Sequence, residues 1–381
     1  MNILLYGWFG ENNVGDELIL DASFSLVKKH CPSAEVNIMG TKPCQVKKLH
    51  RGINFVSTYI DYRPKEILRS FKYSFLDVVK NILKNDILLI ASGGALSDWH
   101  KESTITLFFM IDLFWLMKKP IYMLDVGAGP ININKSYIRF KKRLDKVKVI
   151  TVRDHSSFDA LKELNLGNVH LSRDVVYSYS KCILNRVKNI ETINNSVGIV
   201  VASVCYETKE VYDEYINQIN ILLKKLLQEG YKVSLIPFLY EEDKNFIDKL
   251  KIPKQVQICV NPNDAYKSLE YIAQCEFIVG IRYHALVLAA IMKKKIIPLV
   301  HHGKNGDFAK DFFLNSYAEY IGDGKNWGYS QISADNIIKN LKRINLDEQY
   351  KLNITSAIED KLNMTKAEDI LFNALLNNKK E

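Results

Sequence analysis

The sequence predicts an α/β protein made of two Rossmann-like domains that face a cleft. Three observations support this fold class. Short, continuous apolar runs alternate with segments of helical periodicity, a pattern typical of parallel sheets covered by helices on both faces. One polar stretch, residues 185–195, interrupts the alternation and separates two similar blocks. Finally, glycine-containing loops follow several of the expected strands.

Each block supplies its own strands and helices. The expected strands are 2–6, 35–39, 87–92, 121–127 and 149–152 in the first block, and 196–203, 232–237, 276–280 and 295–300 in the second. Helical periodicity is clear at 156–164, 213–228 and 334–343. These elements divide the chain into an N-terminal Rossmann-like domain (1–185), a C-terminal Rossmann-like domain (196–345) and a closing helical segment (346–381).

Composition indicates a globular protein of a reducing compartment. The chain has 381 residues, 47% hydrophobic content and a formal charge of +9, so an anionic partner is plausible. The six cysteines are widely spaced, as expected of unpaired thiols. Because the start lacks the features of a signal peptide and the apolar window 105–117 is too short to span a bilayer, we expect a cytoplasmic location. No motif for nucleic-acid recognition is present, which argues against that class of partner.

The loop after the first strand is the first candidate binding element. It lies within YGWFGENNVGDELIL (6–20) and leads into a helix that begins near Gly15. Its glycine spacing is neither GxGxxG nor a P-loop, and Asp16 would repel a phosphate. We therefore expect Gly15 to allow close approach of a neutral, hydroxyl-rich ligand and Asp16 to act as its acceptor or base. Alternatively, Asp16 only stabilises the helix dipole.

Two further glycine-containing loops follow later strands of the same block. ASGGALSD (91–98) provides Gly93, Gly94 and Asp98, and DVGAGP (125–130) provides Gly129. Ligands of open parallel sheets bind at the carboxyl ends of the strands. These loops are therefore expected to form one wall of a binding cleft.

The segment EFIVGIRYHALVLAA (276–290) is the most informative part of the second block. A strand ends at Gly280, and Arg282 and His284 then lead into an apolar helix. Arginine can hold a carboxylate or phosphate through two parallel hydrogen bonds, and histidine suits proton transfer near neutral pH. The alternative is a structural role, with His284 capping the helix and Arg282 pairing with a surface acid.

Two other strand ends offer cations. Arg153 in TVRDHSSFDAL (151–161) follows a strand and can bring a second positive charge to the cleft, or can pair at the surface with Asp154. Lys304 in PLVHHGKNGDF (298–308) is a candidate phosphate contact. The doublet His301-His302 suggests a metal site, but adjacent histidines rarely chelate together and no carboxylates stand at ligand spacing. We therefore expect no metal.

The ordered motifs resemble those of the polysaccharide pyruvyl transferase family. They read GxFGxxNxGDE, GGxLxD, GxGP, VRDxxS and RxHALxxAA, with a later GK, and they cover nearly the whole chain. The resemblance implies a glycosyltransferase-B-like fold. It also implies transfer of an enolpyruvyl group from phosphoenolpyruvate to a sugar of a cell-surface polysaccharide precursor, which yields a pyruvate ketal and phosphate. Phosphoenolpyruvate would be a co-substrate, and no cofactor is expected.

The same resemblance assigns roles to residues and domains. The donor-binding residues of the family map onto Arg153, Arg282, His284 and Lys304, so the C-terminal domain is the expected phosphoenolpyruvate side and the N-terminal domain the acceptor side. Tyr283 stands between Arg282 and His284, where leucine is more typical, and is expected to contact the substrate. His284 is the candidate general acid.

Two other functions remain open from the sequence. One is a glycosyltransferase of the same fold that uses a nucleotide sugar, and the other is a non-catalytic saccharide-binding module of polysaccharide assembly. The acceptor can be a free or a lipid-linked saccharide, and a homo-oligomer is compatible with the sequence. Residues 64–86 form a basic amphipathic helix candidate. It either lies on the inner face of the membrane or packs on the sheet as an ordinary Rossmann helix.

Overall fold

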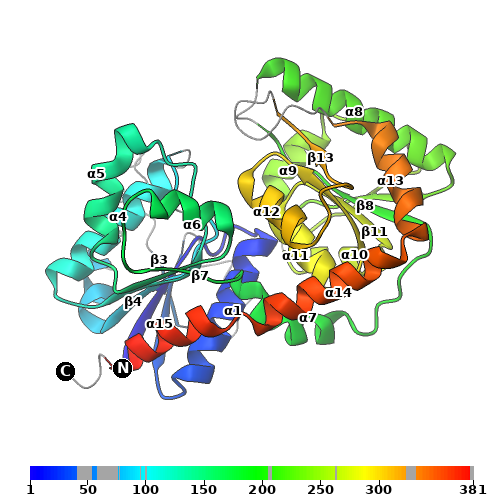
Figure 1. Cartoon of the computed structure of the whole chain (residues 1–381). Helices are drawn as coiled ribbons and strands as arrows, with labels where there is room; N and C mark the ends of the chain where they lie inside the picture. The colour runs from blue at the N-terminus through cyan, green and yellow to red at the C-terminus, as the bar shows by residue number, and fades with distance from the viewer. Residues whose placement is uncertain are drawn as a thin grey trace. The chain divides into compact units, whose positions relative to one another are not determined.

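The computed structural model of the chain divides into two compact units (Figure 1). It describes residues 1–40, 54–57, 76, 78–94, 96–98, 101–204, 208–261, 264–322 and 332–377. The N-terminal unit comprises Met1–Asn12, Asp16–Tyr179 and Met364–Glu381, and the C-terminal unit comprises Asn13–Gly15 and Ser180–Asn363. Each unit contains one parallel sheet, which confirms the predicted α/β class.

The described sheet of the N-terminal unit has the strand order β3-β2-β1-β4-β5-β6-β7. All neighbouring strands are parallel. The strands are β1 (Asn2–Tyr6), β2 (Glu35–Gly40), β3 (Asn54–Ser57), β4 (Ile87–Ile90), β5 (Ile121–Val126), β6 (Val149–Val152) and β7 (Val169–Leu171). The helices are α1 (Val14–His30), α4 (Lys101–Leu116), α5 (Ile133–Leu144), α6 (His155–Lys162) and α15 (Lys366–Asn377), with a 3₁₀ turn η1 (Val175–Tyr179).

The C-terminal unit repeats this plan with the described strand order β10-β9-β8-β11-β12-β13, again parallel. Its strands are β8 (Ser196–Val200), β9 (Lys232–Leu235), β10 (Gln257–Ile258), β11 (Phe277–Gly280), β12 (Lys295–Val300) and β13 (Glu319–Tyr320). Its helices are α7 (Ser180–Val187), α8 (Lys209–Gln228), α9 (Tyr240–Ile247), α10 (Lys267–Gln274), α11 (Tyr283–Ile291), α12 (Gly303–Asp311), α13 (Ala334–Leu346) and α14 (Glu348–Asn363).

The central strands have the continuous burial that their apolar sequences predict. Every residue of β4, β5, β6, β8 and β11 is buried. Side chains on both faces of such a strand must leave water, which requires helices on both faces of the sheet. The nine strands expected from the sequence are all present. Four further strands were not expected, namely β3, β7, β10 and β13, and each lies at an edge of its sheet.

The contact-based division of the chain differs from the expected domain boundaries. Residues 346–381 do not form one closing segment, because α14 groups with the C-terminal unit and α15 with the N-terminal unit. The reason is packing: α15 contacts β5 and β6. The hydroxyl of Tyr122 donates to the carbonyl of Ala374 at 3.0 Å, and the ring of Phe372 stacks on His30 at 4.3 Å. The first unit ends at Tyr179 rather than at 185, because α7 packs on α10.

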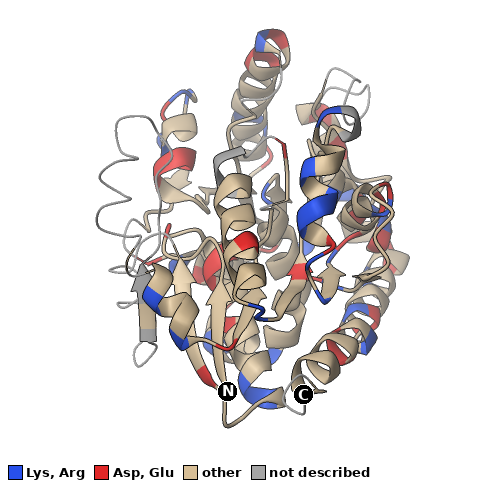
Figure 2. Ribbon diagram, turned by 90° about the vertical axis from the view of Figure 1, so that its left-hand side faces the viewer, with Lys and Arg blue, Asp and Glu red and all other residues tan. Residues whose placement is uncertain are grey.

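The described part of the basic segment 64–86 packs as an ordinary helix. Residues 78–84 are helical, and Val78 and Ile82 are buried in the core of the N-terminal unit. Residues 64–75 and 77 lie outside the described residues. Among the helices that the structure describes, none is long and apolar enough to cross a membrane. Basic residues (blue) and acidic residues (red) are both scattered over the described ribbon (Figure 2).

Candidate functional site

In the N-terminal unit, the predicted loops meet at the carboxyl edge of the sheet. The strand order turns around between β1 and β4, the kind of position where open α/β sheets bind ligands. The loops after β4 and β5 touch backbone to backbone, since a Cβ on Gly127 would stand 2.3 Å from the carbonyl oxygen of Gly93. That position tolerates only glycine. The same Cβ would stand 3.0 Å from Nη2 of Arg153, so this guanidinium lies against the paired loops.

Asp16, Gly93 and Arg153 lie close together in the N-terminal unit. A Cβ on Gly93 would lie 3.2 Å from Nη1 of Arg153 and 3.7 Å from Oδ1 of Asp16. Asp16 is in the first turn of α1, where a carboxylate is favoured by the helix dipole. Its side chain is partly exposed. The group therefore combines an accessible carboxylate, a backbone without a side chain, and a guanidinium.

Arg153 is held in place by carboxylates rather than presented to solvent as an open cation. Its side chain is 2% exposed, with Nη1 bonded to Asp174 at 3.0 Å and Nε bonded to Asp154 at 3.3 Å. Asp154 also accepts from the backbone N–H of Ser157 at 2.8 Å and caps α6. Pairing of this kind makes removal of either partner costly. Arg153 therefore does pair with Asp154, as one of the two sequence interpretations had it, but the pair is buried and not at the surface.

Asp125 is a notable residue of this edge that the sequence did not single out. It has a φ of 48°, its side chain is buried, and a register shift marks a bulge between Met123 and Val126. Thr151 Oγ1 donates to Asp125 Oδ1 at 2.7 Å, whereas Oδ2 has no hydrogen-bond partner. Burial, and then the charge of Glu368, raises the pKa of Asp125 to about 8. Strained backbone and a perturbed carboxyl are both enriched at functional sites.

The remaining predicted residues of this unit have different surroundings. Asp98 accepts from the backbone N–H of Asn132 at 2.7 Å, the hydroxyl of Ser136 at 2.8 Å and Arg139 at 2.6 Å. These bonds tie its loop to the start of α5, which is a structural role. Gly129 has a φ of 95°, and Gly94 faces open space. The contacts of Asp98 are thus with the start of α5 and not with Asp16 or Arg153.

In the C-terminal unit, Arg282 is fixed at the carboxyl end of β11. It is the N-cap residue of α11 and bonds through Nη2 to Asp243 and, at 3.0 Å, to Glu242. Asp243 is completely buried and also accepts the backbone N–H groups of Phe238 and Leu239, which secures the start of α9. Although burial opposes its charge, these two carboxylates raise the pKa of Arg282 above its ordinary value. The guanidinium is therefore a permanent, oriented cation.

His284 is the second residue of α11 and packs against Gly15, at the start of α1. Residues Asn13–Gly15 group with the C-terminal unit, and Val14 donates its N–H to the carbonyl of Phe238 at 3.2 Å. A Cβ on Gly15 would stand 2.1 Å from Nδ1 of His284 and 2.6 Å from its Cγ. Gly15 is therefore glycine because the imidazole occupies the space of a side chain.

The loop after β12 adds His301, His302 and Lys304 to this edge. His302 is the N-cap residue of α12 and accepts from the N–H of Lys304 at 3.4 Å. Asn305, completely buried, donates to the carbonyls of Ile281 at 2.7 Å and Leu299 at 3.1 Å. This amide joins the loop that carries Arg282 to the strand that precedes His301. Two helix N-termini and two cations therefore meet at one strand edge, an arrangement that favours an anion.

Tyr283 is placed differently from its prediction. It is buried, and its ring packs edge-on against His284 at 5.3 Å and Phe308 at 6.4 Å. The side chain thus belongs to the packing between α11 and α12. We see it as support for His284 rather than as a substrate contact.

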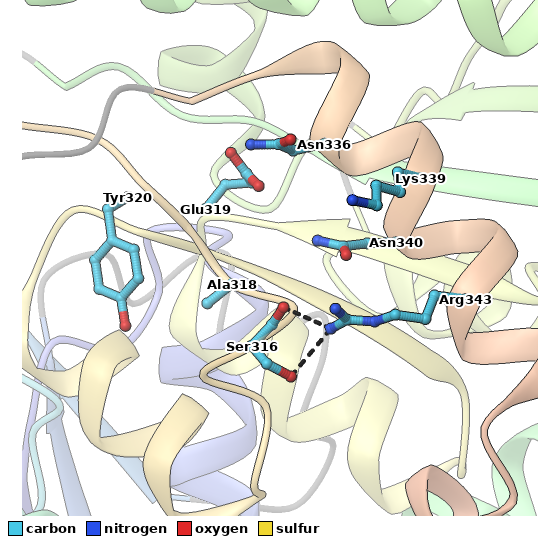
Figure 3. A pocket seen from close by; sticks show the side chains of 8 residues that line it. All are labelled: Ser316, Ala318, Glu319, Tyr320, Asn336, Lys339, Asn340 and Arg343. Carbon is cyan, nitrogen blue, oxygen red and sulfur yellow. Dashed lines mark hydrogen bonds between the residues drawn. The ribbon is translucent and has the colours of Figure 1, made fainter.

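A separate pocket of about 350 Å³ lies beside β13 and α13 (Figure 3). Figure 3 shows Arg343 donating to Ser316, at 2.6 Å to the carbonyl and 3.0 Å to the hydroxyl. None of the predicted site residues lines this pocket. Within the described residues, no group of three or more His, Cys, Asp or Glu side chains could hold a metal ion.

The chain is thus an α/β protein with two Rossmann-like units. In the C-terminal unit, the carboxyl ends of the strands carry the basic residues Arg282 and Lys304. The sequence model of the family described as polysaccharide pyruvyl transferase matches residues 13–303. The chain therefore belongs to the polysaccharide pyruvyl transferase family. Asp16, Arg153, Arg282 and His284 fall inside the matched region, and Lys304 follows it directly. Comparison with curated proteins found no match.

Solved structures with a similar fold include UDP-GlcNAc 2-epimerases. UDP-GlcNAc 2-epimerase from Neisseria meningitidis, bound to UDP-GlcNAc, has a TM-score of 0.66 at 14% identity, covering 99% of this chain and 100% of that chain. The Anabaena protein Alr3699/HepE, in complex with UDP and glucose, has a TM-score of 0.59 at 10% identity, with 100% of both chains covered. UDP-GlcNAc 2-epimerase from Methanocaldococcus jannaschii has a TM-score of 0.54 at 11% identity, covering 90% and 92%. These similarities confirm the glycosyltransferase-B-like fold.

Proposed function

We propose that this protein transfers a pyruvyl group from phosphoenolpyruvate to a sugar of a polysaccharide precursor, forming a pyruvate ketal and releasing phosphate. The observation that carries the proposal is the basic edge formed by Arg282 and Lys304 at the ends of β11 and β12, with His284 in the first turn of α11. It combines fixed positive charge with a proton carrier, inside a chain of the pyruvyl transferase family.

The donor matches the charge of this edge. Phosphoenolpyruvate carries a carboxylate and a phosphate on a small frame, so its binding site needs several oriented cations. Arg282 is oriented by Asp243 and Glu242, and Lys304 lies in the first turn of α12, where the N-terminal N–H groups also attract anions. Arg153 is proposed as a further contact with the donor. Because it is already paired with Asp154 and Asp174, its position is fixed before any ligand arrives.

In the proposed reaction His284 is the general acid. It delivers a proton to the methylene carbon of phosphoenolpyruvate, which becomes a methyl group and leaves an electrophilic carbon beside the phosphate-bearing oxygen. A sugar hydroxyl attacks this carbon and loses its proton. A second hydroxyl of the same sugar then attacks the same carbon, the bond to the phosphate oxygen breaks, and the departing phosphate takes the proton of this hydroxyl as the ketal closes. General acid catalysis of this type contributes about 100- to 10,000-fold.

Asp16 is proposed to orient or deprotonate the acceptor hydroxyl. Its carboxylate is partly exposed beside Gly93, where a neutral ligand can approach the backbone. Gly15, which packs against His284, directly precedes it in the chain. We propose a saccharide, free or lipid-linked, as the acceptor, and the chemistry described needs no cofactor or metal.

Phosphate release tests this function. Purified protein is incubated with phosphoenolpyruvate and a panel of sugar nucleotides and lipid-linked saccharides, with His284→Gln as the matched control. We expect acceptor-dependent phosphate release by the wild type and loss of most turnover in the variant, because glutamine cannot deliver a proton near pH 7. Retention of at least one third of the wild-type rate by His284→Gln would refute the general-acid role. Release of UDP from a UDP-sugar, with phosphoenolpyruvate inert, would instead establish a glycosyltransferase.

A further inference from the structure

His301 is a polar residue of the basic edge that the reaction above does not use. It follows the last residue of β12 and is partly exposed. Its Nδ1 atom, however, is buried and has no hydrogen-bond partner. Nε2 makes no hydrogen bond to the described residues either, but unlike Nδ1 it is not buried. The accessible edge of the ring therefore carries Nε2.

The surroundings of His301 keep its ring uncharged. Loss of solvent around the ring, and then the positive charges of Lys304 and Arg282, lowers its pKa to about 3. The ring of His302 has its centroid 6.3 Å from that of His301, and its Nδ1 accepts from the N–H of Lys304. The carboxylates on this edge, Glu242 and Asp243, are engaged by Arg282. At neutral pH His301 is thus a neutral imidazole.

The buried Nδ1 decides which nitrogen of that neutral ring holds the proton. A proton on Nδ1 would leave a buried donor without an acceptor, which costs more than a buried lone pair near two cations. The proton therefore resides on Nε2, at the accessible edge. Nε2 is then a donor that stays uncharged over the physiological pH range.

The position of this donor is rigid. Asn305 bridges the carbonyls of Ile281 and Leu299, so the backbone before Arg282 and the end of β12 move together. His302 caps α12, which fixes the loop on its other side. A donor held in this way can act on a ligand without a large ordering cost.

We propose that His301 donates from Nε2 to the phosphate group of a ligand bound between Arg282 and Lys304, and so forms the neutral part of a phosphate subsite. The inference rests on the proposed function, because the phosphate would be that of phosphoenolpyruvate before transfer and free phosphate after it. A neutral donor increases the affinity for the phosphate group. It does so without adding a third positive charge to Arg282 and Lys304, which would slow release of the phosphate product. It also leaves His284 as the proton carrier of this edge.

Inorganic phosphate is the probe for the binding test, measured by calorimetric titration of the full-length protein. We expect His301→Leu to weaken phosphate binding roughly tenfold or more, as for loss of one hydrogen bond to a charged group. His301→Gln retains an N–H donor and should bind within about threefold of wild type. His170→Leu, the same change on β7 of the other unit, controls for the substitution. Unchanged phosphate affinity in His301→Leu would overturn the proposal.

Nuclear magnetic resonance of the imidazole nitrogens gives a second measurement that does not depend on a variant folding. We expect His301 to remain neutral from about pH 5 to 9 with the proton on Nε2, and we expect the Nε2 resonance to shift when phosphate is added. Protonation of His301 near the ordinary histidine pKa, or a neutral ring with its proton on Nδ1, would overturn the proposal. If phosphate binds as expected but phosphoenolpyruvate is not consumed, the subsite stands and the proposed function fails. If the wild type consumes phosphoenolpyruvate while His301→Leu binds phosphate normally, the proposed function stands and the His301 subsite fails.

Discussion

Arg282 donates from Nη2 to the carboxylate of Asp243, whose other oxygen accepts the backbone N–H groups of Phe238 and Leu239. One completely buried acid thus anchors the start of α9 and aims the guanidinium at the end of β11. The cation is placed before a ligand binds, so little side-chain entropy is lost on binding.

The guanidinium of Arg282 should contribute directly to donor binding. Arg282→Ala should weaken phosphoenolpyruvate binding about tenfold or more, because charge-assisted hydrogen bonds contribute about 1.5–3 kcal/mol each. Arg282→Lys keeps the charge but loses the planar fork and should fall between the two. Calorimetric titration with phosphoenolpyruvate measures the three affinities. Equal affinities for wild type and Arg282→Ala would remove Arg282 from the donor site.

Gly15→Ala should impair turnover through His284. The added Cβ would stand 2.1 Å from Nδ1, so the imidazole must rotate away from its present position. We expect the rate constant kcat to fall about tenfold or more, since displacing a positioned catalytic group by about 1 Å has effects of this order or larger. Gly167→Ala is the matched control, because its Cβ would meet nothing within 4 Å. Wild-type kcat in Gly15→Ala would show that the packing of Gly15 on His284 does not matter for catalysis.

Asp125 should make the protein less stable as the pH rises. Burial raises the pKa of Asp125 to about 8 in the folded protein, whereas an ordinary aspartate has a pKa of 3.8. Between these values the folded state binds more protons than the unfolded state, so the free energy of unfolding falls with increasing pH. Asp125→Asn removes this dependence and should raise the melting temperature more at pH 8 than at pH 5.

Thermal unfolding of both proteins across that range, with the exposed Asp145→Asn as control, measures the difference. A difference in melting temperature between wild type and Asp125→Asn that does not change with pH would mean that Asp125 is ionised in the folded protein. The variant retains an oxygen that can accept from Thr151, so the comparison isolates the proton from the hydrogen bond.

Activity should survive exhaustive treatment with a chelator. The proposed chemistry uses the cations Arg282 and Lys304 in place of a metal, and the histidines and acids of the described residues form no cluster of metal ligands. The rate of phosphate release before and after chelation is the measurement. Loss of activity that one divalent ion restores would favour the glycosyltransferase.

The sequence predicted the interior of each sheet better than its edges. The nine expected strands are continuous apolar runs because both of their faces are covered, and burial of this kind is visible in the sequence. The four strands that were not expected are all outermost. β10 and β13 have only two residues each, and β10 is exposed. An edge strand is paired on one side only and needs no long apolar run. The hydrophobic pattern of the sequence therefore does not predict such strands.

The site was predictable to the extent that it depends on strand ends. Asp16, Gly93 and Arg153 lie together because parallel strands end at one edge. The partners of these residues depend on chain segments distant in sequence and were not predictable. Asp174 lies 21 positions from its partner Arg153, and Asp243 lies 39 positions from Arg282. Asp125 lay within the quoted loop DVGAGP, but its bulge and its burial are properties of the folded chain.

The most direct test of the central claim is product analysis with phosphoenolpyruvate labelled with carbon-13 at C2. The purified protein is incubated with the labelled donor and the acceptor that supports phosphate release, and the product is examined by nuclear magnetic resonance. The account predicts that the label becomes a ketal carbon bonded to two sugar oxygens and a methyl group, with one phosphate released per ketal formed. Label that remains in phosphoenolpyruvate, while a nucleotide sugar is consumed instead, would contradict it.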